Sequence, residues 1–213
     1  MIANDSPYGL ASSIASLINK KNGFFIEAGA NNGIWQSNSL YLETELGWSG
    51  LLIEPNKNKF EECKKNRAST NLFYNCALVD NKYKEGFIEG YFNEEDYENS
   101  LMAQVCVDNP EFSSDDPRWH GKQSTLVPAK TLSGILKENN VTTIDFLSLD
   151  VEGYELHVLN GLDFSSHAPE LMCVEIRNQS SPDNLFEIKN LLESNSYLLL
   201  STVGHNYIFQ RMI

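Results

Sequence analysis

The chain is predicted to form a three-layer α/β fold, in which a mainly parallel sheet lies between two layers of helices. Short apolar runs of strand type alternate along the chain with segments of helical periodicity, and such alternation favours a parallel sheet covered by helices on both faces. The last two apolar runs, 197–202 and 206–210, flank a turn at Gly204. They predict an antiparallel hairpin that closes the sheet.

The first part of the chain contains three predicted helices and four predicted strands. In the first helix Leu10 and Ile14 recur at helical spacing until Gly23 breaks the pattern. The third helix opens at Pro55, a residue that a first helical turn tolerates. The expected helices span 6–20, 37–46 and 55–66. The expected strands span 24–27, 51–53, 72–79 and, as an additional strand, 87–92.

Residues 93–123 are the least regular part of the chain, rich in acidic residues and interrupted by Pro110 and Pro117. Long irregular segments inside compact domains are often binding loops or lids. Tyr97 and Trp119, within this segment, are candidates for stacking on a sugar ring. Because strand and helix signals resume afterwards, we expect one domain over residues 1–213, with an irregular insertion or lid at about 93–123.

The second part repeats the alternation. Helical periodicity is present at 131–138, 154–162 and 185–193. The apolar run 144–149 ends at Asp150, and the run 171–176 carries Glu175 near its end. Doubly wound dehydrogenase sheets usually end in parallel strands, whereas the terminal hairpin favours the Rossmann-like, seven-stranded sheet of class I methyltransferases.

Composition and charge limit the partners. The chain has 213 residues and a formal net charge of −13, which repels polyphosphates and disfavours a nucleic-acid partner. The basic residues of 57–67 are interleaved with Glu61 and Glu62 and are interpreted as a solvated helix face. No apolar run approaches the roughly 20 residues that span a bilayer, so no membrane partner is expected. Four scattered cysteines favour a reducing, cytoplasmic compartment.

The segment 24–33 is the main functional signal, because an apolar run there ends in Glu27 and is followed by Gly29 and Gly33. Glycines allow a backbone to approach a ligand, and Glu54 closes the next apolar run, where a carboxylate accepts both ribose hydroxyls. No lysine follows the glycines, which argues against a P-loop, and Asn31 interrupts the dinucleotide fingerprint. The pattern therefore favours S-adenosylmethionine over NAD. The alternative is an ordinary strand-end turn with a surface acid.

Glu27 has a second implication for the ligand. A carboxylate at the strand end would repel phosphate, but it suits the cationic amino group of a methionine moiety, directly or through water.

Two sequence blocks resemble the FkbM family of S-adenosylmethionine-dependent methyltransferases. The first runs from Glu27-Ala-Gly-Ala-Asn-Asn-Gly33 through Gly47-Trp-Ser-Gly-Leu-Leu-Ile-Glu54-Pro55, and the second is Leu149-Asp-Val-Glu-Gly-Tyr-Glu155 with the Val174-Glu175 strand end. The resemblance implies O-methylation of a sugar, glycan or other small-molecule hydroxyl. It places the cofactor on Glu27, Gly29, Asn31, Gly33, Asn38 and Glu54, and we add Ala77 and Asp150 to this predicted set.

Three acids are candidates for the chemistry, because Asp150, Glu152 and Glu175 follow neighbouring strands and can converge at the carboxyl edge of the sheet. One of them can serve as the general base that activates an acceptor hydroxyl. In a second interpretation, Asp150 and Glu175 hold Mg²⁺ or another divalent cation. In a third, Glu152 and Glu155 only cap and solvate the helix that starts near Gly153.

Two further functions compete with the methyltransferase. A non-catalytic interaction module on the same fold would tolerate changes of Asp150, Glu152 and Glu175 without loss of function. A nicotinamide oxidoreductase would require a complete glycine fingerprint and a catalytic domain, and the sequence has neither. The sequence does not specify the acceptor or the oligomeric state.

Overall fold

A computed structural model of the chain describes residues 6–92, 103–106, 109, 113, 115, 124–177 and 182–212. Its main sheet has seven strands in the order β10-β11-β9-β8-β1-β2-β3. The strands are β1 (Phe24–Ala28), β2 (Ser49–Ile53), β3 (Leu72–Tyr74), β8 (Phe146–Leu149), β9 (Leu171–Glu175), β10 (Tyr197–Val203) and β11 (Asn206–Arg211). Strands β3, β2, β1, β8 and β9 are parallel, and β11 and β10 follow as an antiparallel pair. The predicted seven-stranded, mainly parallel sheet with a closing hairpin is confirmed.

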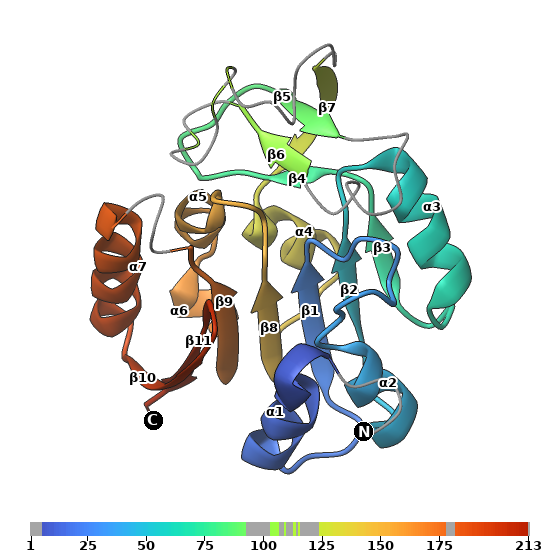
Figure 1. Cartoon of the computed structure of the whole chain (residues 1–213), viewed down its shortest axis with the longest axis vertical. Helices are drawn as coiled ribbons and strands as arrows, with labels where there is room; N and C mark the ends of the chain where they lie inside the picture. Colours follow the sequence, from blue (N-terminus) through green and yellow to red (C-terminus); the bar gives the residue numbers. More distant parts are fainter. Residues whose placement is uncertain are drawn as a thin grey trace.

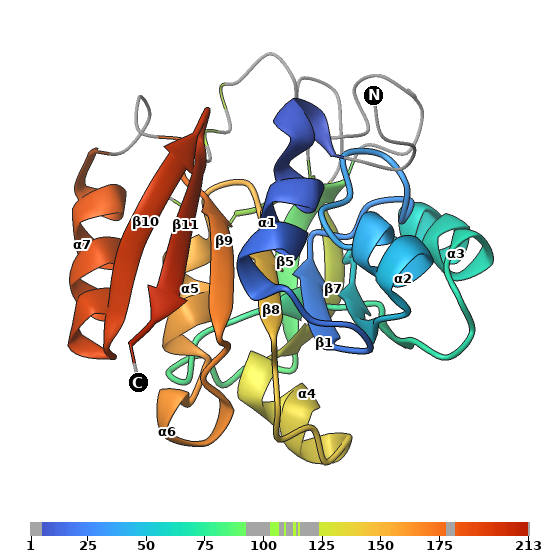
Figure 2. The ribbon, with the colours of Figure 1, turned by 90° about the horizontal axis from the view of Figure 1, so that it is seen from below.

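Helices cover both faces of this sheet (Figure 2). The elements are η1 (Pro7–Gly9), α1 (Leu10–Ile18), α2 (Leu40–Leu46), α3 (Lys57–Asn66), α4 (Leu132–Glu138), α5 (Glu155–Asn160), α6 (Phe164–His167) and α7 (Pro182–Ser194). One apolar core joins the sheet to α1, α2 and α3, and the other joins it to α4, α5 and α7. Successive side chains of a strand point to opposite faces of the sheet, so adjacent residues pack into different cores: Phe25 lies in the first core and Ile26 in the second.

A second, four-stranded sheet lies above the carboxyl ends of the parallel strands (Figure 1). It consists of β4 (Ala77–Leu78), β7 (Thr125–Lys130), β5 (Phe87–Phe92) and β6 (Ala103–Val105), in that order. Its inner side chains Ile88, Val105 and Val127 form an apolar cluster with Tyr154, which follows β8. The small sheet is therefore packed directly on the segment that follows β8.

The single strand predicted at 72–79 is wrong, because the chain changes sheets in its middle. Strand β3 pairs with β2, whereas β4 pairs with β7. Between them the side-chain amide of Asn75 donates hydrogen bonds to the carbonyl oxygens of Glu54 and Pro55, at 2.8 and 2.9 Å. These bonds fasten the crossing point beside the end of β2.

Two other strands were not predicted. Strand β6 lies inside the segment 93–123 that was expected to be irregular; most of that segment, including Tyr97 and Trp119, lies outside the described residues. Strand β7 contains Pro128, which normally argues against a strand interior. The proline is accommodated because β4 pairs only with Ala129 and Lys130.

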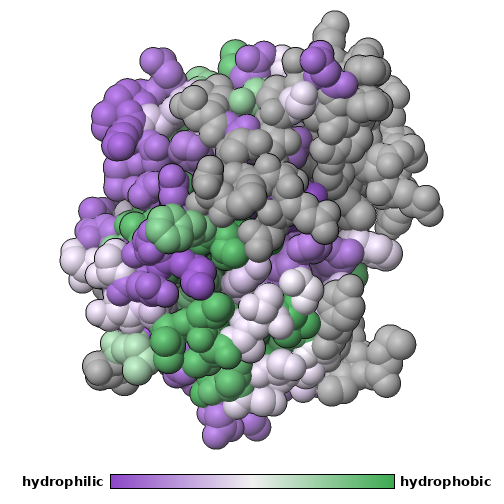
Figure 3. Space-filling view, turned by 60° about the vertical axis from the view of Figure 1, so that its left-hand side comes forward, coloured by the Kyte–Doolittle hydropathy of each residue, from purple (hydrophilic) through white to green (hydrophobic). Residues whose placement is uncertain are grey.

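Two surface features complete the description. Strand β10 is the edge of the main sheet and exposes Leu198 and Leu200, and α7 exposes Phe186. Figure 3 shows apolar side chains gathered on one side of the molecule. None of the described helices is long and apolar enough to cross a membrane. All four cysteines are free thiols.

Candidate functional site

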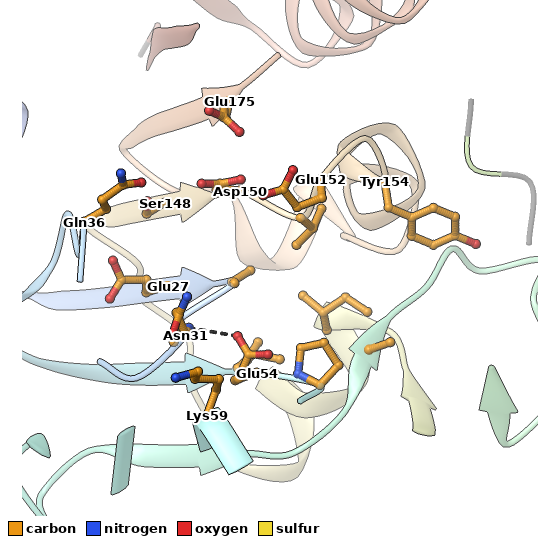
Figure 4. A pocket seen from close by; sticks show the side chains of 18 of the residues that line it. Glu27, Asn31, Gln36, Glu54, Lys59, Ser148, Asp150, Glu152, Tyr154 and Glu175 are labelled. Carbon is orange, nitrogen blue, oxygen red and sulfur yellow. Dashed lines mark hydrogen bonds between the residues drawn. The ribbon is translucent and has the colours of Figure 1, made fainter. Parts of the chain in front are cut away.

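A pocket of about 240 Å³ opens at the carboxyl ends of the parallel strands, beneath the small sheet. The turn after β1, the end of β2, strand β4 and the segment after β8 form its walls (Figure 4). Its lining includes the predicted residues Glu27, Gly29, Asn31, Asn38, Glu54, Ala77, Asp150, Glu152 and Glu175. The sheet topology therefore brings together residues that lie far apart in the sequence.

The turn after β1 is held tightly against its neighbours. The backbone N–H groups of Gly29 and Ala30 both donate to the carbonyl oxygen of Ile53, each at 3.0 Å. Gly29 has a φ of +85°, and a β-carbon there would stand 1.8 Å from the carbonyl oxygen of Asp150. Only glycine therefore fits this position, which joins the ends of β1, β2 and β8.

Glu54 at the end of β2 is buried and faces the pocket (Figure 4). Its Oε2 accepts a hydrogen bond from the backbone N–H of Asn31, and its Oε1 accepts one from that of Asn56, both at 2.8 Å. Burial raises the pKa of Glu54 to about 7, although these two hydrogen bonds and Lys59 oppose the shift. The carboxylate is thus placed by backbone contacts to accept further hydrogen bonds from a ligand.

The Glu27 carboxylate is the centre of a buried network. It accepts hydrogen bonds from the Ser37 hydroxyl at 2.8 Å, the Asn38 N–H at 2.8 Å and the Ser39 hydroxyl at 2.7 Å. Arg67 adds an ion pair at 3.2 Å. The predicted contact of Glu27 with a methionine amino group therefore has to be shared with this network.

Arg67 is fully buried, so its interpretation as part of a solvated helix face is wrong. Its guanidinium donates to Glu27, Glu43, Ser39 and the carbonyl oxygen of Gly33. Gly33 does not line the pocket: a β-carbon there would stand 2.8 Å from Cγ of Arg67. This glycine thus makes room for the arginine.

The three acids predicted for catalysis converge at the other side of the pocket, at the ends of β8 and β9 (Figure 4). Arg177 pairs with Glu152 at 2.7 Å and with Glu175 at 3.4 Å. Asp150 lies beside them, and its Oδ1 is buried without a hydrogen-bond partner among the described residues. Burial, and next the negative charges of Glu175 and Glu152, raise the pKa of Asp150 well above its usual value. A carboxyl group in this environment binds a proton more readily than an exposed carboxyl group does.

Glu152 is held in an unusual backbone conformation, with a φ of +57°. Its carbonyl oxygen accepts hydrogen bonds from the side-chain amides of Gln104 and Asn109, at 3.4 and 3.2 Å. The residues before and after Glu152 are also held, because Oε1 of Glu155 accepts hydrogen bonds from the backbone N–H groups of Val151 and Gly153. Glu155 is buried and holds the turn before α5; it neither caps nor solvates the helix as one interpretation had it, and the Glu152 carboxylate lines the pocket.

The alternative of a metal ion at Asp150 and Glu175 gains no support from the geometry. Among the described residues, no group of three or more His, Cys, Asp or Glu side chains is arranged to hold a metal. The positive charge beside these acids is supplied by Arg177.

Several pocket residues escaped the sequence interpretation, namely Trp35, Gln36, Lys59, Tyr154 and Arg177. Trp35 lies two residues after Gly33, and Arg177 lies two residues after Glu175. The closeness of Trp35 and Arg177 in the sequence to predicted site residues was the available signal. Neither has a spacing that distinguishes it from an ordinary loop residue.

The chain was compared with known proteins. The family model described as Methyltransferase FkbM domain matches residues 27–199. None of the functionally curated proteins matches the chain. Among solved structures, the chain is similar to a methyltransferase from Pyrococcus furiosus, at 12% identity over 95% of this chain and 81% of that chain, with a TM-score of 0.46. It is also similar to a precorrin-6y C5,15-methyltransferase from Geobacter metallireducens, at 8% identity over 98% and 91% of the two chains, with a TM-score of 0.46.

Proposed function

The chain belongs to the FkbM methyltransferase family, and from this membership we propose that it transfers a methyl group to a hydroxyl of a sugar, glycan or similar small molecule. It is an S-adenosylmethionine-dependent methyltransferase by family and fold. Hydroxyl specificity and the nature of the acceptor are the proposed parts. One observation supports them: Asp150, whose Oδ1 is buried without a hydrogen-bond partner in the described part of the chain, lies across the pocket from Glu54, the carboxylate that suits a ribose.

The pocket fits S-adenosylmethionine on two observations. Gly29 lines the pocket, and the lack of a β-carbon lets the turn after β1 pack against the Asp150 carbonyl oxygen, which fixes the backbone at the pocket wall. Glu54 is fixed by the N–H groups of Asn31 and Asn56, which leaves lone pairs for the two ribose hydroxyls. Ala77 of β4 lines the same side of the pocket and is assigned to the nucleoside.

When bound, S-adenosylmethionine supplies a methyl group on a positively charged sulfur, which is already a good leaving group. The protein therefore has two tasks, to align the acceptor oxygen and to remove its proton. Asp150 and Glu175 take the proton: with the pKa of Asp150 raised, the pair can exchange a proton with a hydroxyl that loses it as the new O–C bond forms. Arg177 positions Glu152 and Glu175 by its two ion pairs.

Binding of S-adenosylhomocysteine, followed by isothermal titration calorimetry, tests the cofactor half of the proposal. We expect Glu54→Ala to weaken binding by roughly 10- to 100-fold, as the loss of one or two charge-assisted hydrogen bonds implies. Glu61→Ala is the matched control, because Glu61 is an exposed acid of α3 outside the pocket. A protein that binds neither S-adenosylmethionine nor S-adenosylhomocysteine would refute the proposal.

Methyl transfer separates an enzyme from a non-catalytic module on the same fold. With labelled S-adenosylmethionine and a mixture of methyl glycosides, we expect transfer by the wild-type protein and its loss in Asp150→Asn, while S-adenosylhomocysteine binding is kept. Absence of methyl transfer by the wild-type protein, with S-adenosylhomocysteine binding intact, would favour the non-catalytic module, whereas equal transfer by the two proteins would show that Asp150 is not the base. The cytoplasmic location inferred from cysteine usage stays a prediction.

A further inference from the structure

Two adjacent apolar side chains of the turn after β1 are exposed to nearly the same extent, Ile34 at 51% and Trp35 at 52%. Single exposed apolar residues are common on protein surfaces and need no explanation. Only one of these two, however, lines the pocket: Trp35 does, together with Gln36, and Ile34 does not. The position of the indole, and not its exposure alone, therefore calls for a function.

The backbone that carries Trp35 is fixed before any ligand binds. The N–H groups of Ile34 and Trp35 both donate to Oδ1 of Asn32, at 3.0 and 2.9 Å. The carbonyl oxygen of Asn32 in turn accepts from Nδ2 of Asn66 in α3, at 2.8 Å. On the other side, Ser37 is bonded to the buried Glu27 carboxylate. Because this backbone is already fixed, little of its conformational entropy is lost when a ligand packs on the Trp35 side chain.

The same loop borders the catalytic side of the pocket. Asn38, three residues after Trp35, donates from Nδ2 to the Ser148 hydroxyl of β8 at 3.0 Å. In Figure 4, Gln36 lies toward Ser148 and Asp150, whereas Glu54 lies on the β2 side. The proposed function assigns the β2 side of the pocket to the nucleoside. The loop that carries Trp35 therefore borders the remaining part of the pocket, where the acceptor would bind.

Charge restricts what can occupy that space. Among the described residues, the lining contains five carboxyl groups, of Glu27, Glu54, Asp150, Glu152 and Glu175. The same part of the chain contributes two cationic side chains, Lys59 and Arg177, and Arg177 is already paired with two of the acids. The chain as a whole has a net charge of −13. A phosphorylated or carboxylated acceptor would be repelled both in the pocket and on approach.

We propose that Trp35 is an acceptor-binding residue, and that the acceptor is an uncharged or cationic polyhydroxylated ring whose apolar face packs on the indole. An exposed indole offers a large, rigid apolar surface beside polar groups, which suits a ring with one apolar face and hydroxyls on its rim. The rim hydroxyls then face the carboxyl groups of Asp150 and Glu175. This inference rests on the proposed function and names the acceptor class for the same site.

Saturation-transfer difference NMR on the protein loaded with S-adenosylhomocysteine tests it. The probes are methyl glucoside, methyl galactoside, methyl mannoside and methyl fucoside as neutral rings, glucosamine as a cationic ring and glucose 6-phosphate as an anionic one. We expect saturation of ring protons for at least one neutral or cationic probe, and none for the phosphate. We expect Trp35→Ala to weaken that signal at least about tenfold, Trp35→Phe to retain part of it, and Ile34→Ala, the neighbour outside the pocket, to keep it.

The outcomes separate this inference from the proposed function. If the wild-type protein does not bind S-adenosylhomocysteine in calorimetry, the proposed function itself fails. If it binds, but no neutral or cationic ring is saturated, or Trp35→Ala leaves the signal intact, the acceptor role of Trp35 is wrong. A Trp35→Ala protein that loses S-adenosylhomocysteine affinity tenfold would place the indole in the cofactor site, and that result also overturns the inference.

Discussion

The α-carbon of Gly29, after β1, lies so close to Asp150, after β8, that an added β-carbon would stand 1.8 Å from the Asp150 carbonyl oxygen. The turn that we propose to bind the cofactor and a candidate catalytic segment thus meet through their backbones. Neither segment can move without the other, because the obstructing atom is a backbone oxygen and not a flexible side chain. The geometry of the acceptor side is therefore tied to that of the cofactor side.

Gly29→Ala should destabilise the protein by at least about 2 kcal/mol, because the methyl group would collide with backbone and because a φ of +85° strains any residue with a β-carbon. Urea unfolding gives the measurement. Gly86→Ala is the control, since nothing lies within 4 Å of a β-carbon at Gly86. Similar unfolding midpoints for the two variants would contradict the close approach.

Arg67→Met should cost about 3–5 kcal/mol of stability, because it leaves the buried carboxylates of Glu27 and Glu43 without their cation. We also expect weaker binding of S-adenosylhomocysteine, since Arg67 fastens Gly33, Ser37 and Ser39, next to the residues Glu27 and Asn38 that we predict to bind the cofactor. Lys130→Met, which breaks the exposed pair with Glu138, should leave the unfolding midpoint close to that of the wild type. Equally small losses of stability in the two variants would show that the buried network stabilises the protein no more than the exposed ion pair does.

The strands of the main sheet were predictable because burial on both faces leaves a clear record. Phe25 and Ile26 point to opposite cores and both are fully buried, so β1 reads as a continuous apolar run. The same holds for Leu51 and Leu52 of β2. Such runs end where the parallel strands end, so the sequence alone predicts that Glu54, Asp150 and Glu175 lie at one edge of the sheet.

The small sheet was not predictable in the same way, because its two longest strands, β5 and β7, bury only one face. In β7 only Val127 is buried, and Pro128 interrupts the pattern. Strand β4 pairs with β7 through two residues only, which is too short a segment to show a periodicity in the sequence. The chain passes from one sheet to the other at Asn75, whose side chain bonds to backbone carbonyl oxygens, and such bonds leave no pattern in the sequence. The role of Arg67 escaped for a related reason: its neighbours Lys64 and Lys65 are exposed, and sequence spacing does not distinguish a solvated cation from a buried one.

Binding of S-adenosylhomocysteine should strengthen as pH rises from about 6 to about 8, because the pKa of Glu54 in the free protein is about 7 and the ionised carboxylate accepts the ribose hydroxyls better. Calorimetry at the two pH values gives the measurement. Glu54→Gln should bind more weakly at pH 8 and should lose the pH dependence. A flat profile in the wild type would argue against Glu54 as the ribose ligand.

The same shift has a consequence for the stability of the free protein. The pKa of Glu54 is raised above its ordinary 4.5, so the folded protein holds this proton more tightly than the unfolded chain. Stability should therefore fall as pH rises from about 4.5 to about 7, by up to about 3 kcal/mol from this group. Glu54→Gln should remove that decline, measured as urea midpoints across the range. A decline of equal size in Glu54→Gln would assign it to other groups.

Glu175→Gln should move the acidic limb of the pH profile of kcat/KM to lower pH. After burial, the negative charge of Glu175 is the largest cause that raises the pKa of Asp150, so its removal lets Asp150 ionise in more acidic solution. The profile is measured with labelled S-adenosylmethionine and a glycoside acceptor, and Glu170→Gln is the control, an exposed acid just before β9 and outside the pocket. Because Asp150 and Glu175 act as a pair, the limb belongs to both groups. An acidic limb that stays in place in Glu175→Gln would show that another group removes the proton.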